Sequence, residues 1–242
     1  MTGILEVEKV TKTFSHFVAI KGISLTLEDN EILALIGPNG SGKTTFINVV
    51  SGIFEPDKGT VNLNGRDILG LRPYKIVHLG LNRTFQTPKP FNSLTVSENV
   101  KVALIYGRKK DYNDERKQVE WALEVTGLSD LSAMQASNLN TFHKKMLDLA
   151  RAIVTSPKVL LVDELAAGLS TGEMSLVRKI LLELRGRGIS IIVVEHVMSF
   201  IQGLAERIIV MDAGEKIFEG EFEKLTTDEK VKAVYLGRRS VV

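Results

Sequence analysis

Two patterns of apolar residues divide the chain into elements of different kinds. Residues 32–36, 159–162 and 191–194 are apolar at every position, which is typical of parallel strands covered by helices on both faces. Around residues 5–7 and 23–27, apolar and polar residues alternate instead. This alternation predicts half-buried antiparallel strands. The sequence therefore predicts a buried parallel sheet and a smaller antiparallel sheet.

The middle of the chain has a helical pattern. From residue 87 to about residue 157 the strand pattern is absent, and apolar residues recur with the spacing of a helix. A hairpin is expected near the C-terminal end, where Ala213-Gly214 separates two apolar stretches. The helices expected from the pattern lie over about residues 97–105, 114–126, 143–155 and 172–185.

A glycine-rich segment carries the most specific signal for function. Gly37-Pro38-Asn39-Gly40-Ser41-Gly42-Lys43-Thr44 follows the first apolar strand and precedes a stretch that favours a helix. This order matches a P-loop, whose backbone N–H groups bind the phosphates of a nucleoside triphosphate at a helix N-terminus. Lys43 is expected to contact the β- and γ-phosphates, and the hydroxyl of Thr44 is expected to bind Mg²⁺.

Two acidic residues end the second apolar strand. Asp163 and Glu164 are expected at the carboxyl edge of the sheet, where α/β proteins bind their ligands. Asp163 is predicted to hold Mg²⁺, and Glu164 is predicted to act as the general base for the attacking water. Glu195-His196 ends the next strand in the same way. Without a P-loop, we would interpret Asp163 and Glu164 as polar residues at the point where a strand meets solvent.

The expected fold class is α/β: a P-loop NTPase core with a mostly parallel sheet, an N-terminal antiparallel β subdomain and an inserted helical subdomain. We predict a single domain over residues 1–242. Residues 1–86 and 157–242 would form the α/β core with its β subdomain. Residues 87–156 would form the inserted helical subdomain.

Composition and charge exclude several classes of protein. Of the 242 residues, 44% are hydrophobic, which is sufficient for a substantial core. The formal net charge of +2 is too small to indicate a nucleic-acid partner. We interpret the short basic clusters Arg108-Lys109-Lys110 and Arg238-Arg239 as solvated surface. Because no stretch approaches the roughly 20 apolar residues of a membrane span and no signal-peptide pattern is found, we expect a cytoplasmic protein.

The motifs together resemble a known family. Gly37 to Thr45, Gln86, Asp163-Glu164, Ala167-Gly168-Leu169 and Glu195-His196 are similar, in order and spacing, to the ATP-binding subunits of ABC transporters. The resemblance covers essentially the whole chain. It implies an ATPase that powers transport, with ATP and Mg²⁺ as cofactors. The phosphate-binding residues it implies are Gly37, Pro38, Asn39, Gly40, Ser41, Gly42, Lys43, Thr44 and Thr45.

The resemblance also implies roles for residues outside the P-loop. Phe14 would stack on adenine, although Phe17 is close enough to take that role. Gln86 would contact both Mg²⁺ and the membrane subunit, and His196 would sense the γ-phosphate. Residues 167–170 would form a loop that crosses a dimer interface.

The implied partners are transmembrane permease subunits and a second ATP-binding subunit, in a homodimer or a heterodimer. The chain would lie at the inner face of the cell membrane, held there by the permease. The segment Asn82-Arg83-Thr84-Phe85-Gln86, followed by Phe91, is similar to the branched-chain amino acid importer group. This similarity implies an importer of branched-chain or other amino acids.

One segment departs from the family pattern. The family signature Leu-Ser-Gly-Gly-Gln is expected before Ala150, but the chain has Leu139-Asn140-Thr141-Phe142-His143. Asn140 can still cap the following helix, whereas Phe142 places a benzyl group where glycine allows close approach to phosphate. Two smaller departures are Leu165 in place of proline and Val197 in place of aspartate.

These departures lead to a hypothesis and leave alternatives open. The hypothesis is that the chain pairs with a different subunit whose signature is intact, so that one of the two sites hydrolyses ATP. The main alternative is a non-catalytic or weakly active nucleotide-binding partner in a heterodimeric ABC ATPase. A soluble relative acting on DNA or ribosomes would need a long insertion, a zinc site or a second domain. A small P-loop kinase would not need Gln86 or His196.

Overall fold

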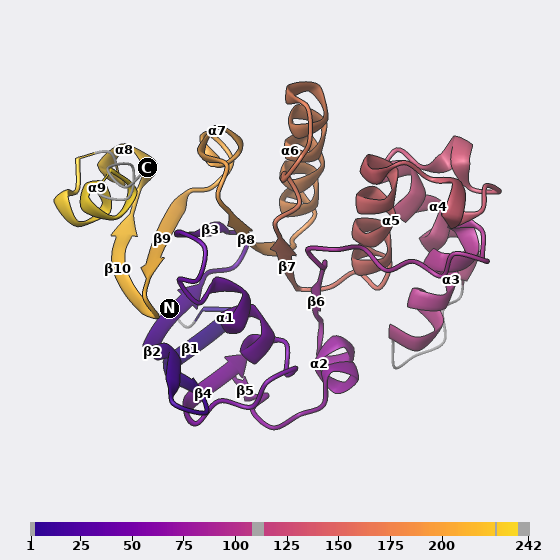
Figure 1. Ribbon diagram of the computed structural model, residues 1–242. Coiled ribbons are helices and arrows are strands. Elements are labelled where there is room, and N and C mark those ends of the chain that lie inside the picture. The colour runs from indigo at the N-terminus through magenta and orange to yellow at the C-terminus, as the bar shows by residue number, and fades with distance from the viewer. Residues whose placement is uncertain (1–2, 108–113, 226, 237–242) are drawn as a thin grey trace.

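The computed structural model describes residues 3–107, 114–225 and 227–236. The basic clusters Arg108-Lys109-Lys110 and Arg238-Arg239, interpreted above as solvated surface, lie outside these residues. Within them the chain forms a four-stranded sheet and a six-stranded sheet, surrounded by helices (Figure 1).

The smaller sheet is antiparallel and comes from the N-terminal part of the chain, as the alternating pattern predicts. Its strands lie in the order β2-β1-β4-β5. The strands are β1 (Leu5–Phe14), β2 (Phe17–Leu27), β4 (Lys58–Leu63) and β5 (Arg66–Asp67).

The larger sheet contains the three continuous apolar stretches as neighbouring parallel strands, which confirms the prediction. Its order is β10-β9-β3-β8-β7-β6, and β10 alone is antiparallel to its neighbour. The predicted hairpin at Ala213-Gly214 joins β9 to β10. The strands are β3 (Ile32–Ile36), β6 (Leu81–Arg83), β7 (Val159–Asp163), β8 (Ser190–Glu195), β9 (Arg207–Asp212) and β10 (Glu215–Gly220).

The expected helices are present, with ends that differ by one or two residues. Between residues 87 and 157, the described part of the chain contains helices and a single isolated β-bridge. The longer helices are α1 (Lys43–Val50), α3 (Val96–Gly107), α4 (Glu115–Val125), α5 (Thr141–Ile153), α6 (Thr171–Gly186) and α9 (Glu229–Leu236). The shorter ones are α2 (Pro73–Leu79), α7 (Met198–Ile201), α8 (Phe222–Leu225) and the 3₁₀ turns Ser129–Leu131 and Ala136–Asn138.

Both faces of the central strands are covered, which explains why their sequences are continuously apolar. Leu160 and Val162 belong to a core cluster shared with α4, α5 and α6. Their neighbours Val159 and Leu161 belong to a second cluster, shared with α1 and the antiparallel sheet. Successive side chains of a strand point to opposite faces, so each apolar residue of β7 is buried in one cluster or the other.

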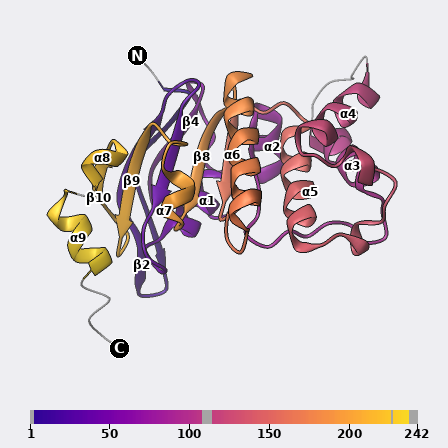
Figure 2. The ribbon, with the colours of Figure 1, turned by 90° about the horizontal axis from the view of Figure 1, so that it is seen from above.

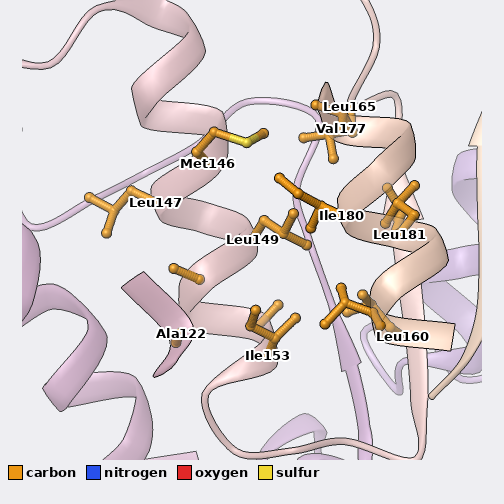
Figure 3. Packing of buried hydrophobic residues seen from close by; sticks show 14 of the residues in the cluster. Ala122, Met146, Leu147, Leu149, Ile153, Leu160, Leu165, Val177, Ile180 and Leu181 are labelled. Carbon is orange, nitrogen blue, oxygen red and sulfur yellow. The ribbon is translucent and has the colours of Figure 1, made fainter. Parts of the chain in front are cut away.

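Helix α5 links the helical region to the sheet. Its residues Leu149 and Ile153 point toward Ile180 of α6 and Leu160 of β7, and all four are buried (Figure 3). Figures 1 and 2 show α3, α4 and α5 together at one end of the molecule, with α8 and α9 at the other. The boundaries of an inserted subdomain at residues 87 and 156 stay a prediction. Among the described residues, none of the helices has both the length and the apolar character of a membrane span.

Candidate functional site

The glycine-rich segment forms a loop between β3 and the N-terminus of α1. Gly37 has a φ of 153°, and a Cβ there would overlap the carbonyl oxygen of Met211. Gly42 has a φ of 103°, and a Cβ there would lie 2.6 Å from the carbonyl oxygen of Ala19. Only glycine fits at these two positions, because they combine a positive φ with a close approach of backbone. The loop is therefore supported by β9 on one side and β2 on the other.

A hydrogen bond from the C-terminal part of the chain adds to this support. The backbone N–H of Gly214 donates to the carbonyl oxygen of Ser41 at 3.1 Å. Gly214 lies in the β9–β10 hairpin, far from the loop in sequence. The phosphate loop therefore depends on the completed sheet.

The ammonium group of Lys43 lies inside the loop. Its Nζ donates to the carbonyl oxygens of Gly37 at 2.8 Å and Pro38 at 3.0 Å, and to Ser41 Oγ at 3.4 Å. Burial lowers the pKa of Lys43, while the carboxylates of Glu164 and Asp163 oppose that shift. The loop and the two acids predicted to share its site are thus close enough to interact. Thr44 and Thr45 follow in the first turn of α1, and Thr44 is exposed.

Asp163 is the buried acid of the site. Its Oδ2 accepts a hydrogen bond from Arg83 Nη2 at 3.2 Å. Its Oδ1 is buried and has no hydrogen-bond partner. Burial raises the pKa of Asp163, nearby Glu164 adds to the shift, and Arg83 and Lys43 oppose it. Because a buried polar atom without a partner is costly, this oxygen fits the role of a cation ligand.

The donor set is suited to Mg²⁺ bound together with a phosphate. In the described part of the chain, no group of three or more His, Asp or Glu side chains could hold a metal ion. Mg²⁺ commonly takes only one or two protein oxygens and completes its shell with water and phosphate. Asp163 and the hydroxyl of Thr44 could supply those two oxygens.

Glu164 and Gln86 meet at the same edge of the sheet. Gln86 Nε2 donates to Glu164 Oε2 at 2.6 Å, although the two residues are 78 positions apart. The backbone N–H of Glu164 donates to the carbonyl oxygen of Val194 on the neighbouring strand β8 at 2.9 Å. The structure therefore brings together two residues that the sequence could only associate through a family resemblance.

The structure does not bring every predicted residue into this cluster. His196 is exposed beyond the end of β8, where it acts electrostatically on the neighbouring Glu195. Phe14 is 39% exposed and packs edge-on against Phe54, with ring centroids 5.2 Å apart. Phe17 is 66% exposed. Phe14 is therefore not a core residue, and the choice between Phe14 and Phe17 as the adenine contact stays open.

Arg83 lies in the site, but the sequence analysis assigned it no role and named it only within a segment that is similar to the importer group. Its Nη1 donates to Asn48 Oδ1 at 2.6 Å and to Ser51 Oγ at 3.0 Å. Its guanidinium also stacks on the ring of Phe85, 4.7 Å from the centroid. Arg83 therefore connects α1, β6 and the carboxylate of Asp163. Its partners are distant in sequence, so no local pattern could have indicated them.

The altered signature segment forms a capped helix start. Asn140 Oδ1 accepts from the backbone N–H of His143 at 2.8 Å, as expected for an N-cap. Phe142 is partly buried and packs against the helical core cluster. The aromatic ring is therefore partly accommodated by packing against this cluster.

Comparison with known proteins agrees with this geometry. Residues 20–167 match the ABC transporter family. The chain is 34% identical to a probable branched-chain amino acid transport ATP-binding protein LivG of Methanocaldococcus jannaschii, over 97% of both chains. It is 31% identical to the high-affinity branched-chain amino acid transport ATP-binding protein BraF of Pseudomonas aeruginosa, over 97% of this chain and 98% of the relative.

Solved structures with a similar fold are also ATP-binding cassettes of ABC transporters. An ATP-binding cassette of an ABC transporter in its ADP conformation superposes with a TM-score of 0.86 at 33% identity, covering 98% of this chain and 100% of the other. A nucleotide-free cassette superposes with a TM-score of 0.85 at 33% identity, covering 96% and 98%. The chain therefore belongs to the ABC transporter family.

Proposed function

We propose that this chain is the ATP-binding and ATP-hydrolysing subunit of an ABC importer for branched-chain or other amino acids. The observation that carries the proposal is the assembly of Lys43, Asp163, Glu164 and Gln86 at one edge of the parallel sheet. The relatives named as branched-chain amino acid transport ATP-binding proteins match nearly the whole chain. A non-catalytic partner has no comparable support, because the candidate general base is present at this edge.

The residues of the site divide the chemistry of phosphoryl transfer among them. The loop from Gly37 to Thr45 binds the triphosphate through its backbone N–H groups, and Lys43 adds a positive charge. Asp163 and the hydroxyl of Thr44 would hold Mg²⁺, which would supply positive charge against the phosphates. Glu164 accepts a proton from the attacking water, and its hydrogen bond with Gln86 orients its carboxylate. Phe14 or Phe17 stacks on the adenine, and His196 contacts the γ-phosphate.

The permease docks on the apolar surface beside Gln86. A hollow of about 210 Å³ lies there, lined by Ile53, Val77, Arg83 and Phe85 among others. Ile53 and Phe85 of this lining are exposed large apolar side chains, and the exposed ring of Phe91 lies against Arg151, which also lines the hollow. Such a gathering is typical of a protein interaction site. Because Phe85 stacks on Arg83, which pairs with Asp163, the docking surface is connected to the candidate metal ligand through Arg83. The subunit thereby associates with the inner face of the membrane through its permease.

A second ATP-binding subunit with an intact signature completes the active dimer. The residues of the P-loop site are all present in this chain, whereas the segment that would face the partner's ATP lacks both glycines. One of the two sites in the dimer therefore hydrolyses ATP efficiently.

Lys43→Ala should weaken ATP binding by about 1.5–3 kcal/mol, the usual contribution of a hydrogen bond to a charged group. Calorimetric titration of the full chain with ATP measures the change. Lys101→Ala, at an exposed position of α3, is the matched control and should bind ATP like the unsubstituted chain. Equal affinity of Lys43→Ala and the control would contradict the assignment of Lys43.

Glu164→Gln should lower ATP turnover by about 10²–10⁴-fold, the usual contribution of a general base, and leave ATP affinity nearly unchanged. Phosphate release by the assembled transporter in the presence of Mg²⁺ measures turnover, and chelation of Mg²⁺ should stop it. Glu124→Gln, at an exposed position of α4, serves as the control. Near-normal turnover of Glu164→Gln would remove Glu164 from the role.

Phe85→Ser should reduce the amount of permease that co-purifies with this subunit, because it removes an aromatic side chain that is 49% exposed at the docking surface. Leu176→Ser, which removes an exposed apolar side chain from α6, is the matched control. If the two variants retain the permease equally well, the docking surface lies elsewhere.

The dimer proposal predicts that the isolated chain hydrolyses ATP slowly and that adding a subunit with an intact signature raises turnover. Phosphate release by the chain alone and by the mixture, at equal total subunit concentration, gives the comparison. Fast turnover by the chain alone would rule out the need for a different partner.

A further inference from the structure

Lys145 is a buried cation with no part in the function described so far. It lies on α5, and the residue is only 6% exposed. Lysine is almost never this buried without a partner. Its Nζ donates to the carbonyl oxygens of Ala167 at 2.6 Å, Leu165 at 2.9 Å and Glu164 at 3.3 Å. Because an ammonium group has three N–H donors and no acceptor, these bonds use its full capacity.

The three carbonyl groups belong to the loop that carries the candidate general base. This loop joins β7 to α6, and Glu164 is its first residue. Glu164 has a φ of 48°, in the left-handed region that residues other than glycine rarely adopt. Such a conformation is strained and persists only where surrounding contacts hold it.

Glu195 also holds this loop, but it binds a backbone N–H group, whereas Lys145 binds carbonyl groups. Its Oε1 accepts from the backbone N–H of Ala166 at 2.6 Å, between the peptide groups that Lys145 binds. Burial lowers the pKa of Lys145, while the charges of Glu195 and Glu164 oppose that shift. Burial raises the pKa of Glu195. The loop is thus fixed by one buried cation and one buried acid.

We propose that Lys145 is a positioning residue for ATP hydrolysis, which fixes the backbone of residues 164–167 so that the Glu164 carboxylate stays beside Gln86. The inference rests on the proposed role of Glu164 as the general base. Without the ammonium group, three carbonyl oxygens lose their donor, and the loop rotates to satisfy them elsewhere. Glu164 moves with that rotation, because it is part of the same backbone.

The first test replaces the ammonium group with an apolar group of similar length. In the transporter assembled from full-length subunits, Lys145→Met should lower kcat by about 10- to 100-fold, the usual effect of a displacement near 1 Å in a catalytic group. KM for ATP should change by less than about threefold, because the phosphate loop keeps its own contacts. Lys179→Met, at an exposed position of α6, is the matched control and should keep normal kcat.

A conservative variant separates positioning from general stability. Lys145→Arg keeps the positive charge and the N–H donors, so it should retain more of kcat than Lys145→Met. The thermal midpoint of each variant is measured as well, and assays are run well below it. If Lys145→Met does not fold, Lys145→Gln, which keeps a neutral donor, takes its place. A normal kcat in the folded Met or Gln variant would overturn the proposal.

A double-mutant cycle with Glu164→Gln tests whether Lys145 acts through Glu164. If it does, Lys145→Met causes no further loss of residual turnover once the Glu164 carboxylate is absent. If the fold-loss of turnover in the double variant equals the product of the two single fold-losses, Lys145 has an independent role and the proposal is overturned. High turnover in Glu164→Gln alone would overturn the general-base assignment. Normal kcat in Lys145→Met beside an inactive Glu164→Gln would overturn only the role of Lys145.

Discussion

The parallel pairing of β3, β8 and β7 is the constraint on which the site depends. In this register Ile36 lies opposite Glu195, and Asp163 lies opposite Val194. The phosphate loop after β3 and the acids after β7 and β8 therefore emerge at the same edge, although they are separated by more than a hundred residues of sequence. The apolar side chains that bury both faces of these strands hold that register, since a slip of one residue would exchange the faces.

The buried charged side chains at this edge have partners of opposite charge nearby or hydrogen bonds to the backbone. Arg83 neutralises Asp163, and the cationic Lys145 lies near Glu195 and the backbone of Glu164. Buried charges are tolerated because each has hydrogen-bond partners. The unpartnered Oδ1 of Asp163 is the exception among the residues named here. A single unsatisfied acceptor beside a lysine and a phosphate loop is a feature that a bound cation would stabilise.

Local patterns in the sequence were sufficient for the elements and for the phosphate loop. The continuously apolar strands, the helical region and the hairpin at Ala213-Gly214 all have short-range signals, and the structure confirms them. Residues whose importance depends on long-range contacts could not be found in this way. Arg83 and Lys145 act through partners contributed by other elements. The roles of Phe14 and His196 stay predictions, because each depends on contact with a bound nucleotide.

The close contact between the phosphate loop and the end of β9 has a consequence for the order of folding. Residues near position 40 rest on Met211 and Gly214, which the ribosome supplies some 170 residues later. A nascent chain that stops before β9 lacks the contacts that support the phosphate loop from Met211 and Gly214, even though every residue of the motif has already been made. We therefore expect nucleotide affinity to be acquired late in synthesis, when β9 and β10 complete the sheet.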